Sequence, residues 1–200
     1  MANDQEAVAD FTLISHLLRL HEDHDKQHDV SARGKLANLR YGMRDRLHSD
    51  YPVGRVFPAM PPGGMTNDPN RNEWRTLIAS LFGFSHDEIE HEKKTSLGFA
   101  LRSLYEQEER ESLERRFMAL LNADEEHLPG HLRQSISLLK SAKIPISLDW
   151  SELLNDVCAW NMPGKVIQKK WARDYYRARK EKTSTPAPSE NTAISDNLFE

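Results

Sequence analysis

The residues with the clearest chemical potential are the lysines and arginines of segment 161–182, which carries eight of them against two acids. An uncompensated row of cations is the chemistry that binds phosphate backbones. The same pattern is also typical of a solvated helix face that only closes a domain. At about 100° per helical residue, five cations fall within one arc of roughly 120°: Lys165, Lys169, Arg173, Arg177 and Lys180.

To present such a row, the segment must fold as an amphipathic helix. Ile167, Trp171 and Tyr175 lie on nearly the opposite side of this predicted helix and can pack against the rest of the chain. We expect Asn161 to cap the start of the helix and Pro163 to occupy its first turn, where the missing N–H is harmless.

A second basic stretch follows an acidic N-terminus. Residues 1–30 carry seven acids against two bases, whereas residues 33–46 carry five bases against one acid. We predict a helix over about 32–48 with Ser31 as its cap. A row of arginines without an acid favours phosphate contacts over isolated surface ion pairs. Three arginines share one edge of this helix, within roughly 40°: Arg33, Arg40 and Arg44.

The sequence makes no comparable case for catalysis. It contains no nucleophilic-serine motif, no glycine-rich phosphate loop and no calcium-binding loop. The single cysteine, Cys158, falls on the apolar side of a predicted helix, which predicts a buried and unreactive thiol. We therefore expect a binding or scaffold protein without a cofactor.

The histidines give only a weak metal signal. His21, His24 and His28 lie among acids, but no cysteine or second cluster completes a site, so a solvated helix end is the preferred interpretation. His86 and His91 are five positions apart, not the four of the zinc-protease motif. A metal-dependent enzyme is the weakest of the three functional hypotheses.

Composition limits the class of protein. Two hundred residues with a net charge of −4 suit one domain or two small ones. No apolar run approaches the ~20 residues of a membrane span, and the acidic start is unlike a signal peptide. One cysteine fits a reducing compartment, so we expect a cytoplasmic protein that does not contact a membrane.

Helical periodicity predicts an all-α fold with seven to nine helices in two packed bundles and no sheet. The expected units are an N-terminal domain over 1–106, a C-terminal domain over 107–182 and a disordered tail over 183–200. The proline- and glycine-rich segment 49–70 is a predicted loop with a helical turn near 53–59. The helix over 5–27 is expected to bury four residues: Val8, Phe11, Ile14 and Leu18.

Two local features sharpen the prediction for the second half. Asp149, with Glu152 three residues later, has the pattern of a capping box that starts a helix over 150–160. Gly98 lies inside a predicted helix, where its missing side chain would let a neighbouring helix approach closely.

Several segments in order resemble a known family. Four segments of the second half carry the resemblance: LGFALRSL, ERRFMALLNADEEHLPGHLRQSISLLKS, IPISLDWSELLNDVCAW and VIQKKWARDYY. They are similar to the small subunit (CasB type) of the type I-E CRISPR Cascade complex. RGKLANLRYGM and WRTLIASLFGF, earlier in the chain, resemble the same family. The resemblance spans about residues 8–178.

This resemblance implies an all-α subunit without catalytic activity. It implies a dimer between the large subunit and the repeated backbone subunits, close to the guide RNA, that stabilises the displaced strand of target DNA. The alternative is a helical scaffold whose basic faces bind acidic partner proteins. The nucleic-acid-binding surface would comprise Arg33, Lys35, Arg40, Arg44, Arg115, Arg116, Lys165, Lys169, Lys170, Arg173 and Arg177.

Overall fold

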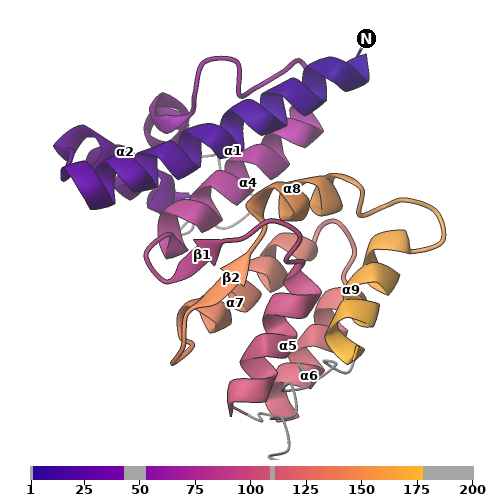
Figure 1. Ribbon diagram of the computed structural model, residues 1–200. Helices are drawn as coiled ribbons and strands as arrows, with labels where there is room; N and C mark the ends of the chain where they lie inside the picture. Colours follow the sequence, from indigo (N-terminus) through magenta and orange to yellow (C-terminus); the bar gives the residue numbers. More distant parts are fainter. Residues whose placement is uncertain (1, 43–52, 109–110, 178–200) are drawn as a thin grey trace, which may run out of the picture.

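The computed structural model describes residues 2–42, 53–108 and 111–177, and this part of the chain is almost entirely helical (Figure 1). The all-α prediction is therefore confirmed. In chain order the elements are α1 (Ala2–Gln27), α2 (Val30–Tyr41), α3 (Val53–Val56), the 3-10 turn η1 (Phe57–Ala59), α4 (Pro69–Ser85), β1 (Ile89–His91), α5 (Leu97–Glu108), α6 (Glu111–Leu121), α7 (Leu128–Lys140), β2 (Ile146–Leu148), α8 (Trp150–Cys158) and α9 (Val166–Tyr176).

One small sheet departs from the expectation that there is none. β1 and β2 pair in parallel, with Ile89 opposite Ile146 and His91 opposite Leu148. Three-residue strands are too short to show the alternating pattern by which strands are recognised in a sequence. The sheet fixes the approach to two helices, because β1 leads into α5 and β2 leads directly into α8.

The N-terminal helices pack as a layer in which α1 lies across α2 and α4 (Figure 1). The predicted buried stripe of α1 is partly wrong, because Val8 is 64% exposed and Phe11 is 74% exposed. The buried side instead follows an overlapping helical period that runs through Ala9, Leu13 and Leu17. Because this stripe contains an alanine, it is less apolar than the predicted stripe with Val8 and Phe11.

The second helix begins differently from the prediction. Asp29 is its cap, with a side chain that accepts a hydrogen bond from the Ser31 backbone N–H. The helix is described as far as Tyr41, and the rest of the predicted span, including Arg44, lies outside the described residues. The helical turn near 53–59 is confirmed by α3 and η1.

The later helices pack around α5, which contacts α6, α7 and α9. The close approach predicted at Gly98 is confirmed: a Cβ atom there would lie 2.2 Å from the backbone oxygen of Trp171 in α9. The predicted cap of α8 is also confirmed, because the Asp149 side chain accepts hydrogen bonds from the N–H groups of Ser151 and Glu152. The buried apolar side chains of both halves form one continuous cluster, and the division near 107–111 stays a prediction.

None of the helices in the described ranges combines the length and the hydropathy that a membrane crossing requires.

Candidate nucleic-acid interface

The basic helix α9 starts later than its sequence pattern predicts. Gly164 and Lys165 have positive φ angles of 82° and 53°, and the helix begins at Val166. Asn161 and Pro163 therefore lie before the helix rather than at its cap and first turn. Two successive left-handed residues redirect the chain after α8, and a glycine accepts that conformation without strain.

The apolar side of α9 is docked as predicted. Ile167, Trp171 and Tyr175 are all buried. The Trp171 indole N–H donates to Asp156 Oδ2 of α8 at 2.6 Å. The Tyr175 ring stacks on Phe117 of α6, with ring centroids 4.1 Å apart. These contacts fix the rotation of α9, so its opposite side faces solvent.

Lys170 belongs to the packing rather than to the exposed row. Its Nζ lies 2.6 Å from Glu152 Oε1 and 2.8 Å from Asp156 Oδ1, both on α8. Burial raises the pKa of Asp156, while hydrogen bonds from Lys170 and Trp171 favour its charged form. The ammonium group therefore neutralises a buried carboxylate, and it is already occupied by protein partners.

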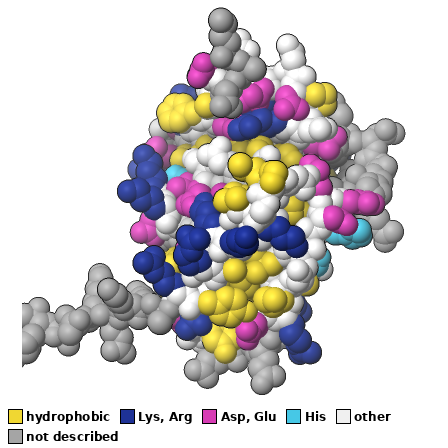
Figure 2. Space-filling view, turned by 90° about the vertical axis from the view of Figure 1, so that its right-hand side faces the viewer, with side chains coloured by type: hydrophobic (Ala, Val, Ile, Leu, Met, Phe, Trp, Pro, Cys, Tyr) yellow, Lys and Arg dark blue, Asp and Glu magenta, His cyan; other side chains and the backbone are white. Residues whose placement is uncertain are grey.

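The outer side of α9 carries Lys169 and Arg173, which are both exposed. They are four residues apart, so their side chains leave the helix one above the other. Neither forms an ion pair with any residue that the structure describes. Lys165 and Arg177, also exposed, flank the two ends of the helix. Figure 2 shows lysine and arginine side chains gathered on the side of the molecule that carries α9.

The arginine pair of α6 is exposed as well. Arg115 and Arg116 form no ion pair within the described part of the chain. Adjacent helical residues point about 100° apart, so the two guanidinium groups point in different directions. α6 touches α9 through the Tyr176 hydroxyl, which donates to Glu114 Oε1 at 3.0 Å.

The basic residues of α2 form a separate region. Arg33 is exposed and Lys35 is partly exposed. The Arg40 Nε donates to the carbonyl oxygen of Gly83 at 3.3 Å, so this side chain also holds α2 against α4. α2 and α9 lie on opposite sides of the molecule (Figure 1). The structure therefore brings the predicted cations together in two regions rather than one.

The cysteine matches the expected inert thiol. Cys158 is partly buried, and burial raises its pKa to about 11. At neutral pH the sulfur is protonated, which is the unreactive form.

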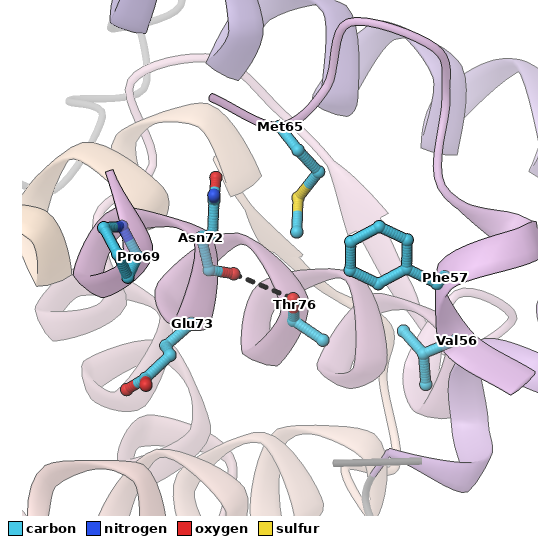
Figure 3. A pocket seen from close by; sticks show the side chains of 7 residues that line it. All are labelled: Val56, Phe57, Met65, Pro69, Asn72, Glu73 and Thr76. Carbon is cyan, nitrogen blue, oxygen red and sulfur yellow. Dashed lines mark hydrogen bonds between the residues drawn. The ribbon is translucent and has the colours of Figure 1, made fainter. Parts of the chain in front are cut away.

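A pocket of about 200 Å³ lies between η1 and α4 (Figure 3). Figure 3 shows a mostly apolar lining and the hydrogen bond from the Thr76 hydroxyl to the Asn72 carbonyl. Its one ionisable lining residue is Glu73, so the described lining provides no acid–base pair for catalysis. The lining residues are Val56, Phe57, Met65, Pro69, Asn72, Glu73 and Thr76.

Comparison with known proteins identifies the family. The family model of the CRISPR-associated protein Cse2 matches residues 35–176, which is most of the chain. The chain belongs to the Cse2 family. A curated Cse2 protein from Thermus thermophilus is 31% identical over 127 residues, covering 62% of this chain and 69% of the relative.

Solved structures agree with this assignment to the Cse2 family. CasB from Thermus thermophilus is similar with a TM-score of 0.63 and 25% identity, over 82% of this chain and 97% of that one. CasB from M. ruber gives a TM-score of 0.57 and 30% identity, over 81% of this chain and 93% of that one. The resemblance to the CasB-type small subunit of Cascade is therefore confirmed.

Proposed function

We propose that this Cse2-family chain is a non-catalytic Cascade subunit that holds nucleic-acid backbone without reading its sequence. The observation that carries the proposal is the pair Lys169 and Arg173, exposed on a rigidly docked helix and free of described acidic partners. Lys165 and Arg177 extend the same basic surface. Its proposed ligand is the displaced strand of an opened target DNA, in antiviral defence.

The chemistry needed for this role is modest. In guide-directed recognition, base pairing reads the sequence. The RNA–DNA duplex that forms is about as stable as the DNA duplex that it replaces, so protein contacts to the backbone can shift the equilibrium toward the opened DNA. Holding the displaced strand slows its return to the complementary strand. Lysine and arginine side chains along a surface are sufficient for such binding, because every nucleotide offers the same phosphate.

Four other cations of the predicted surface suit secondary contacts in the same assembly. The proposed candidates are Arg115, Arg116, Arg33 and Lys35. Their proposed ligands are guide RNA, target DNA, the large subunit and the backbone subunits. We also propose that the chain works as a homodimer inside the complex. Arg40 and Lys170 are proposed to have mainly structural roles, because both already bind protein atoms.

The second candidate function is a scaffold that only joins protein subunits. The exposed apolar side chains of Val8 and Phe11 on α1 favour it, because large apolar groups on a surface are typical of contact regions. In that case the basic surfaces would face acidic partner proteins rather than nucleic acid.

One experiment separates the two functions. Lys169→Glu with Arg173→Glu is incorporated into the complex, and both subunit content and target-DNA binding are measured. The proposal expects the subunit to be retained while R-loop formation weakens. Loss of the subunit from the complex in the absence of DNA would instead support the scaffold. Lys93→Glu with Lys143→Glu, at exposed positions just after β1 and just before β2, is the control with the same charge change.

A further inference from the structure

A histidine cluster forms where α1 meets the end of α4. His21 Nδ1 lies 3.3 Å from His86 Nδ1, and His86 Nδ1 lies 2.8 Å from Asp87 Oδ1. One ligand atom from each of these three residues lies within 4.8 Å of the other two. His86 is buried, whereas Asp87 reaches the surface, so the cluster is accessible from one side.

The spacing of the two nitrogen atoms fits a shared cation. Zinc binds imidazole nitrogen at about 2.0–2.1 Å in a tetrahedral arrangement, which places neighbouring ligand atoms roughly 3.3 Å apart. The observed distance of 3.3 Å between the Nδ1 atoms of His21 and His86 equals this separation between zinc ligands. Asp87 would need to move only slightly outward from His86, and its side chain is 53% exposed and free to do so.

The charges around the cluster are mixed. Asp87 supplies a negative charge beside His86, whereas Arg40 contributes an opposing positive charge. A metal ion binds the neutral form of an imidazole.

A third histidine adds an independent observation. His24 follows His21 by one helical turn, and its ring centroid lies 5.9 Å from that of His86. Its Nδ1 atom is buried and has no hydrogen-bond partner within the described residues. A buried nitrogen without a partner is costly, and a metal ion or a metal-bound water at this place would satisfy it.

We propose that His21, His86 and Asp87 bind a divalent transition-metal ion of the zinc class, with His24 or water in the fourth position. Nitrogen and carboxylate ligands in this combination suit zinc better than magnesium or calcium. The ion would tie the C-terminal part of α1 to the end of α4. Because it binds the folded chain, it would stabilise the fold in proportion to its concentration.

The test uses the full-length chain without an affinity tag. After incubation with zinc chloride and gel filtration, elemental analysis should find roughly one zinc ion per chain. The melting temperature should rise with zinc, and cobalt chloride should give the visible absorption of a tetrahedral site. Asp87→Asn and His21→Ala should each lose all three signals. Circular dichroism checks that both variants remain folded, and Asp87 is exposed enough for the substitution to be tolerated.

His28→Ala is the matched control, because His28 is near in sequence but is not one of the clustered ligands. It should retain zinc like the parent chain. Absence of retained zinc together with an unchanged melting temperature would overturn the proposal. It would also be overturned if Asp87→Asn and His21→Ala bound zinc normally, or if only His28→Ala lost it, since the ligands would then lie in the segment just after α1. In those cases the cluster is a packed group in which His86 stacks on Phe82.

Discussion

At the scale of single residues, the adjacent lysines of α9 have different duties. Lys169 points to solvent, whereas Lys170 lies between two carboxylates of α8. Both are equally basic in the sequence. A rotation of about 100° between neighbouring helix positions decides which one remains available to a ligand.

The two lysines should therefore differ in their effect on stability. Lys170→Ala leaves the buried Asp156 carboxylate without its cation, and we expect the free energy of unfolding to fall by about 1–3 kcal/mol. Lys169→Ala should change it by less than about 0.5 kcal/mol. Urea denaturation measures both values. Equal effects from the two substitutions would mean that Lys170 does not hold α9 on α8.

His16 should make stability depend on pH. Its Nε2 lies 3.1 Å from the Ala59 carbonyl oxygen, and burial lowers its pKa below 6.5, with smaller contributions from Lys35 and Arg19. Just below pH 6.5 the unfolded chain then binds more protons than the folded one, so stability increases with pH.

We expect the contribution of His16 to the free energy of unfolding to be constant above pH 6.5. Below that value this contribution should fall as the solution is acidified. His16→Gln should reduce the slope of this fall. Urea titrations at several pH values test the difference between the two chains. Parallel curves for the parent and the variant would contradict the assignment.

At the scale of elements, the contact between α5 and α9 depends on one glycine. A Cβ atom at Gly98 would meet the Trp171 backbone oxygen at 2.2 Å, and backbone cannot move aside as a side chain can. Gly98→Ala should separate the helices and cost about 1–3 kcal/mol or more.

Gly130→Ala in α7 is the control, because nothing lies within 4 Å of its Cβ position. That substitution should be neutral or stabilising by up to about 1 kcal/mol, since alanine favours helix more than glycine. Thermal unfolding compares the two. A harmless Gly98→Ala would show that α9 does not approach α5 so closely.

The contact between α1 and α4 depends on a buried arginine. Arg75 is fully buried, with Nε 2.8 Å from Asp10 Oδ1 and Nη2 2.6 Å from Glu6 Oε2. Arg75→Met should cost about 1–3 kcal/mol, because Glu6 and Asp10 lose one of their two arginine partners and keep only Arg71. Arg19→Met, at an exposed position of α1, should cost less than about 0.5 kcal/mol. Denaturation curves would contradict the account if both variants were equally stable.

The elements that the sequence predicted well are those with long periodic patterns or clear caps. α8 follows from Asp149 and its apolar positions, and the docked side of α9 follows from Trp171 and Tyr175. β1 and β2 could not be predicted, because three residues carry no period and each strand is fixed by its partner 57 positions away. The rotation of α1 was partly missed because two overlapping stripes have the same helical spacing.

At the scale of the whole molecule, local charge matters more than the total. The chain has a net charge of −4, yet the outer side of α9 presents cations without described acidic partners. Ions screen charges beyond about 8–10 Å at physiological salt, so acids elsewhere on the surface weaken this side only slightly. A basic side on an acidic chain suits a subunit whose position is fixed by a larger assembly.

The candidate site was predictable in part. The sequence identified Lys169 and Arg173 as outward-facing cations, because their spacing follows the helical period. It did not reveal that Lys170 is held by Asp156, which lies 14 positions away, nor that His86 meets His21. Contacts between distant segments depend on how the helices pack, and the spacing of residues along one helix does not encode them.

The most direct test of the central claim is the salt dependence of target-DNA binding by the assembled complex. Each phosphate contact to a single strand contributes about 0.7 to the slope of log affinity against log salt. The complex that contains Lys169→Ala with Arg173→Ala should therefore show a slope shallower by about 1.4, and weaker binding at low salt. An unchanged slope and an unchanged affinity across the titration would contradict the claim that this side of α9 holds nucleic-acid backbone.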